Sequence, residues 1–384
     1  MVKQQGSEDA ATRNDESDET RDTRPKAPQR SGPAPITVTV AQLSEFDEVI
    51  DVRSEGEYFD DHIPGALSCP VLDDAERALV GTIYKQSSSF DAKKIGAALV
   101  SANISRHLRE RFQDRPREWR PLVYCWRGGG RSGSLANVLA QIGWRVGQLE
   151  GGYKSYRRAV MADLAQLPHQ FSWRVVCGMT GTGKSRLLRA LDAAGAQVLD
   201  LEALAAHRGS ILGNLPGEPQ PSQKMFDSLV WHELRRFDRS RPVLVEAESK
   251  KIGRLRVPEA LIEAMWRSEC LVLDAPIDVR VALLKSEYTH YIAEPQALIA
   301  QIECLTPLHG RETIDRWQAL AREGKSDAFV EELLVRHYDP AYTRSTLKHY
   351  PALEHAPRFA MHDAGDAAFA SLAAEVIEQL LARA

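Results

Sequence analysis

The sequence predicts an α/β protein with two parallel-sheet domains in tandem. Short apolar segments typical of buried strands alternate with helical segments along most of the chain, as in parallel sheets covered by helices. At two points, within 122–139 and 173–194, an apolar strand runs into a glycine-rich loop and then a helix. A loop of this kind directs backbone N–H groups and a helix N-terminus at one point, which favours anion binding.

Composition narrows the class of protein before any motif is considered. The 384 residues suffice for two domains, and no apolar run is long enough to cross a membrane. The N-terminus is polar and lacks the apolar segment of a secretory signal, so we expect no membrane association and a cytoplasmic location. The net charge of −4 predicts no general affinity for nucleic acid, so any RNA contact requires a local basic patch.

The cysteines predict neither a disulfide framework nor a zinc site, because they are spaced singly and their number is odd. They are Cys69, Cys125, Cys177, Cys270 and Cys304. Residues 1–33 are rich in charged residues and proline and nearly free of large apolar groups, so we expect a disordered tail. A tethering arm is the functional alternative for this segment.

The first domain is predicted to span residues 34–160. Its expected strands are 36–40, 48–52, 67–70, 122–125 and 146–149, with a helix around 93–111 and another after the glycine loop. Cys125 ends the fourth of these strands, where the N-terminal field of the next helix favours a thiolate. The candidate anion pocket around it consists of Arg127, Gly128, Gly129, Gly130, Arg131 and Ser132. A buried, inert cysteine is the alternative.

The motifs of this domain resemble the rhodanese family. They are Asp51-x-Arg53, Glu57-Tyr58, 62–66 (His-Ile-Pro-Gly-Ala), the Cys125 loop and 149–152 (Leu-Glu-Gly-Gly). The resemblance implies that Cys125 carries sulfur or another chalcogen, and that Asp51, Glu57, Tyr58 and His62 are structural. Cysteine-dependent phosphatases share the Cys-x5-Arg spacing of Cys125 and Arg131, and the spacing alone does not separate these two functions.

The second domain is predicted to span residues 165–384. Its strand 173–177 leads into 178–185, which matches the P-loop pattern G-x4-G-K-[ST] in the required strand, loop and helix context. The candidate phosphate-binding residues are Gly178, Gly181, Gly183, Lys184 and Ser185. The glycines let backbone amides wrap a phosphate chain, the lysine adds a charge, and the serine can reach Mg²⁺.

Acidic residues follow two further strands of this domain, at 197–200 and 242–246. Asp200, Glu246 and Glu248 are candidates for holding Mg²⁺ or acting as bases, and helix capping or ion pairing is the alternative. A strand at 270–274 and a helix at 278–285 follow, and from residue 296 we expect only helices, including 328–336 and 367–384. The architecture resembles that of P-loop kinases of nucleosides and small molecules.

Several basic clusters are candidates for contacts with an RNA backbone. They comprise Lys250, Lys251, Arg254 and Arg256, just after an inferred strand that ends at the catalytic edge of the sheet, and the segments 235–241 and 344–348. Solvated helix and loop faces are the alternative. The aromatic residues Tyr288, His290 and Tyr291 have the chemistry to stack on a base, although such spacing is more typical of a core.

Together the two domains resemble the bacterial tRNA 2-selenouridine synthase family. The marks are the Cys125 loop, 150–154 (Glu-Gly-Gly-Tyr-Lys), the P-loop, 207–210 (His-Arg-Gly-Ser) and 248–253 (Glu-Ser-Lys-Lys-Ile-Gly). The resemblance implies that wobble 2-thiouridine of Lys, Glu and Gln tRNAs is S-geranylated from geranyl diphosphate and then converted to 2-selenouridine with selenophosphate. It implies catalytic roles for Cys125, Arg127, Arg131 and Lys184. It implies no tightly bound cofactor, with Mg²⁺ as an optional ion.

Two other classes of function fit some of the same residues. A sulfurtransferase or cysteine phosphatase fused to a small-molecule P-loop kinase would turn over ATP without tRNA. A non-catalytic RNA-binding or regulatory protein would use nucleotide binding as a switch. The full set of anion-pocket residues argues against the second.

Overall fold

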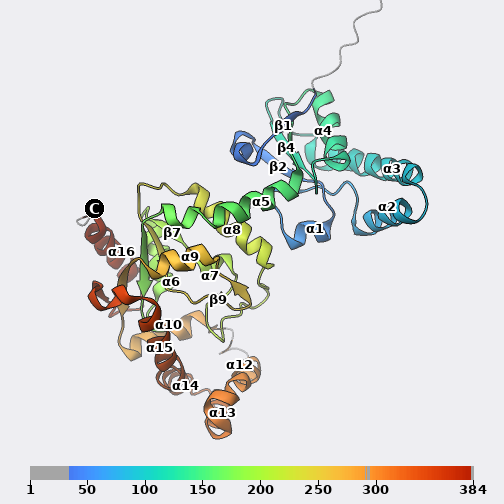
Figure 1. Cartoon of the computed structure of the whole chain (residues 1–384). Helices are drawn as coiled ribbons and strands as arrows, with labels where there is room; N and C mark the ends of the chain where they lie inside the picture. The colour runs from blue at the N-terminus through green and yellow to red at the C-terminus, as the bar shows by residue number, and fades with distance from the viewer. Residues whose placement is uncertain (1–33, 290, 292–294, 382–384) are drawn as a thin grey trace, which may run out of the picture.

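The computed structural model describes residues 34–289, 291 and 295–381, with two five-stranded sheets in this part of the chain (Figure 1). All pairings within both sheets are parallel, which confirms the predicted α/β class. The tail 1–33, for which we expect disorder, lies outside the described residues. No helix in the described ranges is both long and apolar enough to span a bilayer.

The first sheet has the strand order β1-β5-β4-β2-β3. Its strands are β1 (Ile36–Val38), β2 (Glu48–Asp51), β3 (Leu67–Ser68), β4 (Pro121–Tyr124) and β5 (Gly147–Leu149). Strand β4 is buried along its whole length and lies at the centre of this order. The chain segment that follows β4 therefore leaves from the middle of the sheet edge. This is where an open α/β sheet places a ligand site.

The helices of this region are α1 (Glu55–Asp60), α2 (Asp74–Gln86), α3 (Ser89–His107), α4 (Gly130–Ile142) and α5 (Gly152–Leu164). A π-helical turn, Leu108–Phe112, continues α3 to the end of the predicted helix. Helices α1 and α2 are not among the elements predicted from the sequence. Both carry a local signal, a capping box, with Ser54 and Glu57 at α1 and Asp73 and Glu76 at α2. Helices α2 and α3 project together to one side (Figure 1).

The second sheet has the strand order β12-β11-β6-β8-β7. Its strands are β6 (Trp173–Cys177), β7 (Gln197–Leu199), β8 (Val243–Glu246), β11 (Glu269–Asp274) and β12 (Arg358–Ala360). The expectation of helices alone after residue 296 is wrong, because β12 pairs with β11 at the edge of the sheet. A three-residue strand with one buried side chain shows too little periodicity to be detected from sequence.

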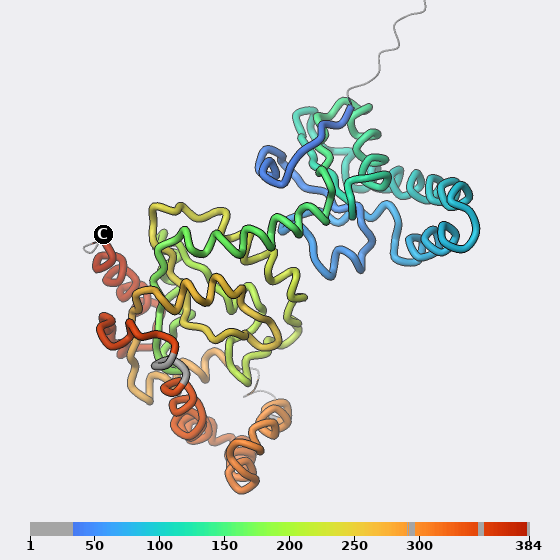
Figure 2. Tube along the Cα trace, viewed as in Figure 1, coloured from blue at the N-terminus to red at the C-terminus, as the bar shows by residue number. Residues whose placement is uncertain are grey.

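The helices of the second region surround this sheet and extend beyond it. They are α6 (Lys184–Ala193), α7 (Leu201–Leu204), α8 (Gln223–Arg236), α9 (Glu259–Trp266), α10 (Ile277–Glu287), α12 (Pro295–Ile302), α13 (Thr306–Arg322), α14 (Ser326–Leu333), α15 (Asp339–His349) and α16 (Asp366–Leu381). A short antiparallel hairpin joins β9 (Lys251–Ile252) to β10 (Leu255–Arg256). Figure 2 shows α12 and α13 (orange) as an arm that extends away from the sheet. An apolar cluster around Trp317 contains residues of α12, α13 and α14.

Helix α5 joins the two regions. It leaves the first sheet and runs beside α8 of the second region (Figure 1), with Tyr156 packed edge-on against Trp231 at 5.4 Å between ring centroids. Arg157 on the same helix pairs with Asp227 on α8. One apolar core cluster contains residues of both regions, so the two sheets are connected by packed side chains as well as by the chain.

A buried carboxylate, Asp61, stands at this junction. It accepts hydrogen bonds from the Tyr153 hydroxyl at 2.7 Å and from the Ser228 hydroxyl at 2.8 Å, so it bridges α5 and α8. Arg53 donates to its backbone carbonyl at 2.6 Å. Burial raises the pKa of Asp61, and these hydrogen bonds from Tyr153 and Ser228 oppose that effect.

The Asp61→Ala variant should lose about 2–4 kcal/mol of unfolding free energy, because two buried hydroxyl groups lose their acceptor. Urea unfolding followed by tryptophan fluorescence measures the loss. The neighbouring Asp60→Ala variant is the control, since Asp60 makes a solvent-exposed ion pair with Lys224 that is worth about 0–1 kcal/mol. Equal, small losses in both variants would show that Asp61 does not stabilise the junction.

Two candidate anion sites

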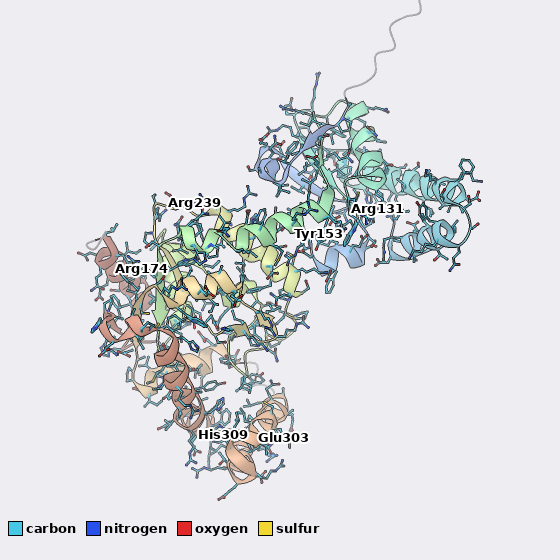
Figure 3. All side chains as sticks on the ribbon, viewed as in Figure 1. Arg131, Tyr153, Arg174, Arg239, Glu303 and His309 are labelled. Atoms are coloured by element: carbon cyan, nitrogen blue, oxygen red, sulfur yellow. The ribbon has the colours of Figure 1, made fainter. Side chains whose placement is uncertain are left out.

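The first candidate site lies where β4 ends and α4 begins. Cys125 follows β4 directly and is 4% exposed, and the glycine run brings the chain into α4. The Ser132 hydroxyl donates to the Cys125 Sγ at 3.2 Å. Figure 3 shows Arg131 and Tyr153 on the side of this region near α1. The structure therefore places the predicted residue Ser132 against the thiol.

The surroundings of Cys125 favour its thiolate. Burial raises the pKa of this thiol, but the Ser132 hydroxyl and the backbone N–H groups of Ser132 and Arg127 outweigh burial by hydrogen bonding to the sulfur. The charge of Arg131 acts in the same direction, and the net pKa is lowered. A thiolate is the reactive form of cysteine, so the geometry agrees with a chemical role.

A residue of helix α1, Glu57, orients the Arg131 side chain. Its guanidinium donates to both carboxylate oxygens of Glu57, at 2.7 and 3.3 Å. Burial raises the pKa of Glu57, but the paired Arg131 outweighs it and the net pKa is lowered. Glu57, which we expect to be structural, therefore positions a predicted site residue. Arg127 is exposed at the loop surface.

Two glycines let the Cys125 loop pack against the start of α5. Gly128 has a φ of +69°, and a Cβ there would lie 2.6 Å from the Leu149 carbonyl oxygen. A Cβ on Gly152 would lie 2.2 Å from the Cys125 carbonyl oxygen. The same carbonyl accepts from the Tyr153 N–H at 2.8 Å. Any side chain at either glycine would separate the two segments.

The second candidate site is the P-loop between β6 and α6. Gly181 and Gly183 have φ values of +83° and +87°, so the loop adopts a left-handed conformation that only glycine takes without strain. The Lys184 ammonium donates to the Gly178 carbonyl at 2.8 Å and lies 3.4 Å from a Glu246 carboxylate oxygen. Burial lowers the pKa of Lys184, but the neighbouring carboxylates outweigh this effect and keep the lysine charged.

Three carboxylates face the P-loop. Glu202, Glu246 and Glu248 each offer an oxygen within 4.8 Å of the others. The Ser185 hydroxyl donates to Glu246 at 2.9 Å and to Glu202 at 3.1 Å. Burial, and then mutual repulsion, raises the pKa values of Glu202 and Glu248 well above the usual range. This donor set of hard oxygens fits Mg²⁺, which would relieve that repulsion.

The structure does not bring Asp200 into this acidic group. Its carboxylate accepts from the Ala203 N–H at 2.9 Å and caps α7. Glu202, two residues later on α7, lies beside Ser185 instead. The sequence places both acids just after β7, but the turn into α7 decides which of them faces the P-loop.

An apolar pocket adjoins the P-loop cleft. The cleft and the pocket share Thr180, Ser210, Leu284, Tyr288 and Tyr338. Beyond these, the pocket is lined mainly by apolar side chains, most of them from α12, α14 and the helical turn after α14; they include Leu212, Leu298, Phe329, Val330, Leu333 and Leu334. Tyr288 and Tyr291, which also line this pocket, are named from the sequence only as candidates for base stacking. The apolar residues of the pocket are not predicted from the sequence, because they come from separate helices that only the fold brings together.

The aromatic and basic candidates occupy different places. Tyr291 is buried in the apolar cluster around Trp317 and stacks on Tyr288 at 6.1 Å between centroids, whereas His290 lies outside the described residues. Lys250, Lys251, Arg254 and Arg256 lie on the exposed β9–β10 hairpin or next to it. The Arg254 guanidinium donates to the Gln220 carbonyl, so it also fixes the hairpin. An RNA contact at this hairpin stays a prediction.

The Ser132→Ala variant should shift the pH profile of Cys125 alkylation toward higher pH, because the thiolate loses its hydroxyl donor. Iodoacetamide labelling of the Cys125 peptide, quantified by mass spectrometry across a pH series, gives the profile. Ser134→Ala is the matched control, since Ser134 lies on the same helix and bonds the Gly130 carbonyl instead. Identical profiles in the wild type and both variants would contradict the role of Ser132.

The Glu248→Gln variant should weaken Mg²⁺ binding by about tenfold or more, because one anionic ligand is lost. In the wild type, binding should weaken as the pH falls, since the raised pKa values let protons compete at a higher pH than at an ordinary carboxylate. Calorimetric titration with MgCl₂ measures both effects. Asp200→Asn is the control, and an equal loss in that variant would contradict the assignment to Glu202, Glu246 and Glu248.

Known proteins match both regions of the chain. Residues 38–159 match the family described as rhodanese-like domain, and residues 171–305 match the tRNA 2-selenouridine synthase AAA domain. A tRNA 2-selenouridine synthase from Nitrosomonas europaea is 35% identical over 62% of this chain and 63% of its own length.

Two further relatives carry the same name and align over more of their length. The relative from Aeromonas salmonicida is 31% identical over 80% of this chain and 90% of its own length. The relative from Shewanella halifaxensis is 31% identical over 77% of this chain and 87% of its own length. On the strength of these matches, the chain belongs to the tRNA 2-selenouridine synthase family.

Proposed function

We propose that this protein converts wobble 2-thiouridine of tRNA to 2-selenouridine through S-geranyl-2-thiouridine, using geranyl diphosphate and selenophosphate. The observation that carries the proposal is the apolar pocket that adjoins the P-loop cleft. A prenyl diphosphate has an anionic head and a hydrocarbon chain, and it matches a phosphate-binding loop next to an apolar pocket. Thiolated tRNAs for Lys, Glu and Gln are the expected substrates.

In the first step, the P-loop stabilises the departing diphosphate. The amides around Gly181 and Gly183 and the charge of Lys184 face the leaving group, while the geranyl chain occupies the apolar pocket. The allylic C–O bond breaks, the thiouridine sulfur forms the new S–C bond, and the uridine loses its N3 proton. Bound by Ser185, Glu202, Glu246 and Glu248, Mg²⁺ would supply further positive charge for the diphosphate.

In the second step, the Cys125 loop holds the selenium donor. Arg127, Arg131 and the amides of the glycine run bind the phosphate end of selenophosphate, and Cys125 positions its selenium. Selenium bonds to C2 of the S-geranylated base, and the C2–S bond breaks as the geranylthiolate leaves and takes up a proton. Water then cleaves the Se–P bond, which releases phosphate and leaves 2-selenouridine. The lowered pKa of Cys125 raises the thiolate fraction of this sulfur relative to an ordinary cysteine.

Two variants separate the steps. Cys125→Ala should accumulate S-geranyl-2-thiouridine and make no 2-selenouridine, whereas Lys184→Ala should lower formation of both products by about a hundredfold or more. Mass spectrometry of nucleosides from thiolated tRNA incubated with both co-substrates gives the yields. Cys304→Ala and Arg189→Ala are matched controls, because both side chains are exposed and away from the two loops.

Unchanged 2-selenouridine from Cys125→Ala would contradict the role of the thiol. Unchanged geranyl transfer by Lys184→Ala would contradict the assignment of the diphosphate to the P-loop.

A further inference from the structure

Trp126 is an exposed tryptophan beside the reactive thiol. It follows Cys125 in the chain and is 36% exposed, whereas Trp119, Trp144, Trp173, Trp231 and Trp317 are buried and Trp266 is half-buried. The core of the first region does not require the Trp126 ring, because much of the surface of this ring faces solvent. A large exposed aromatic side chain at a reactive centre suggests that a ligand covers it.

The Trp126 ring is held in place before any ligand arrives. It stacks on Tyr153 with 5.1 Å between centroids and 28° between the ring planes. The Tyr153 hydroxyl is fixed by Asp61, and the Arg53 guanidinium lies 4.1 Å from the Tyr153 ring centroid. The Trp126 backbone carbonyl accepts from the Lys154 N–H at 3.1 Å. A platform ordered in advance loses little conformational entropy on binding.

A hollow opens next to this ring. Its lining includes Trp126 and Arg131 from the Cys125 loop and Leu72, Val80 and Tyr84 from or near α2. The acidic groups of the same lining each have a cationic partner: Glu57 pairs with Arg131, Asp60 with Lys224 and Asp74 with Arg77. The hollow thus offers an aromatic and apolar surface without an unpaired carboxylate to repel phosphate.

Exposed cations lie next to Trp126 in the chain or on the helix that contacts it. Arg127 follows Trp126 directly, and Lys154, whose N–H bonds the Trp126 carbonyl, lies four residues before Arg158 on α5, so these two side chains share a helix face. None of the three forms an ion pair with another residue in the part of the chain that the structure describes. Unpaired cations beside an exposed aromatic ring form the combination that binds single-stranded RNA, because bases stack while phosphates pair with the cations.

We propose that the target nucleotide of tRNA stacks its base on Trp126, with Lys154 and Arg158 binding the adjacent phosphates. The proposal rests on the proposed function for one point, that tRNA is the substrate. Stacking would hold the pyrimidine ring beside Cys125 for the selenium step. Trp126 is then a binding residue of the first region, separate from the P-loop.

Tryptophan fluorescence tests this proposal without selenium or geranyl diphosphate. The full chain is titrated with a synthetic RNA stem-loop that carries an unpaired uridine in its loop, and binding should quench the emission. Trp126→Phe should abolish most of the quenching while keeping the affinity within about threefold, since phenylalanine still stacks. Trp126→Leu should weaken binding by about tenfold or more. Trp266→Phe is the control and should quench like the wild type.

Several outcomes would overturn the assignment. One is quenching that persists in Trp126→Phe, and another is Trp126→Leu binding the stem-loop as tightly as the wild type does. Equal binding and quenching by a fully paired RNA duplex would indicate contacts with the backbone alone. Quenching by geranylthiol but not by the stem-loop would make the hollow a hydrocarbon site.

The same variants distinguish this proposal from the proposed function. With saturating tRNA, Trp126→Leu should still form S-geranyl-2-thiouridine at the P-loop and should lose at least tenfold in the rate of selenium exchange. Failure of both steps in the wild type would reject the proposed function while leaving the binding result intact. Normal selenium exchange in Trp126→Leu would reject the stacking role alone.

Discussion

The contact between the Cys125 loop and the start of α5 is the constraint on which the rest of the arrangement depends. Gly128 and Gly152 have no side chains, so two backbone segments meet at distances that a Cβ would prohibit. The contact fixes the loop around the thiol and sets the direction of α5. Because α5 then packs against α8, the same constraint places the first site relative to the second region.

The two anion sites differ in their charge. Around Cys125, Arg127 is exposed and Arg131 has one carboxylate partner, so the loop retains positive potential for an anion. At the P-loop, Lys184 faces three carboxylates, whose ionised forms would repel an approaching diphosphate. A divalent cation reverses that balance, which gives the acidic group a physical reason to lie beside a phosphate-binding loop.

Local motifs predicted much of this structure, and long-range packing accounts for the rest. The P-loop and the Cys125 loop follow from contiguous glycines and their flanking strands, and β6 has the predicted bounds. Glu202, and not the predicted Asp200, faces the P-loop, and the backbone turn at α7 determines this. The apolar pocket and the stacking of Trp126 on Tyr153 bring together residues that are distant in sequence. The periodicity of a single segment carries no information about such contacts.

We propose that the P-loop cleft with its apolar pocket holds a prenyl diphosphate in place of a nucleotide. Calorimetric titration of the full chain with geranyl diphosphate, in the presence of MgCl₂ and with ATP as competitor, tests it most directly. We predict saturable binding of geranyl diphosphate that requires Mg²⁺ and that equimolar ATP does not displace. Tight binding of ATP, with no heat from geranyl diphosphate, would contradict the account.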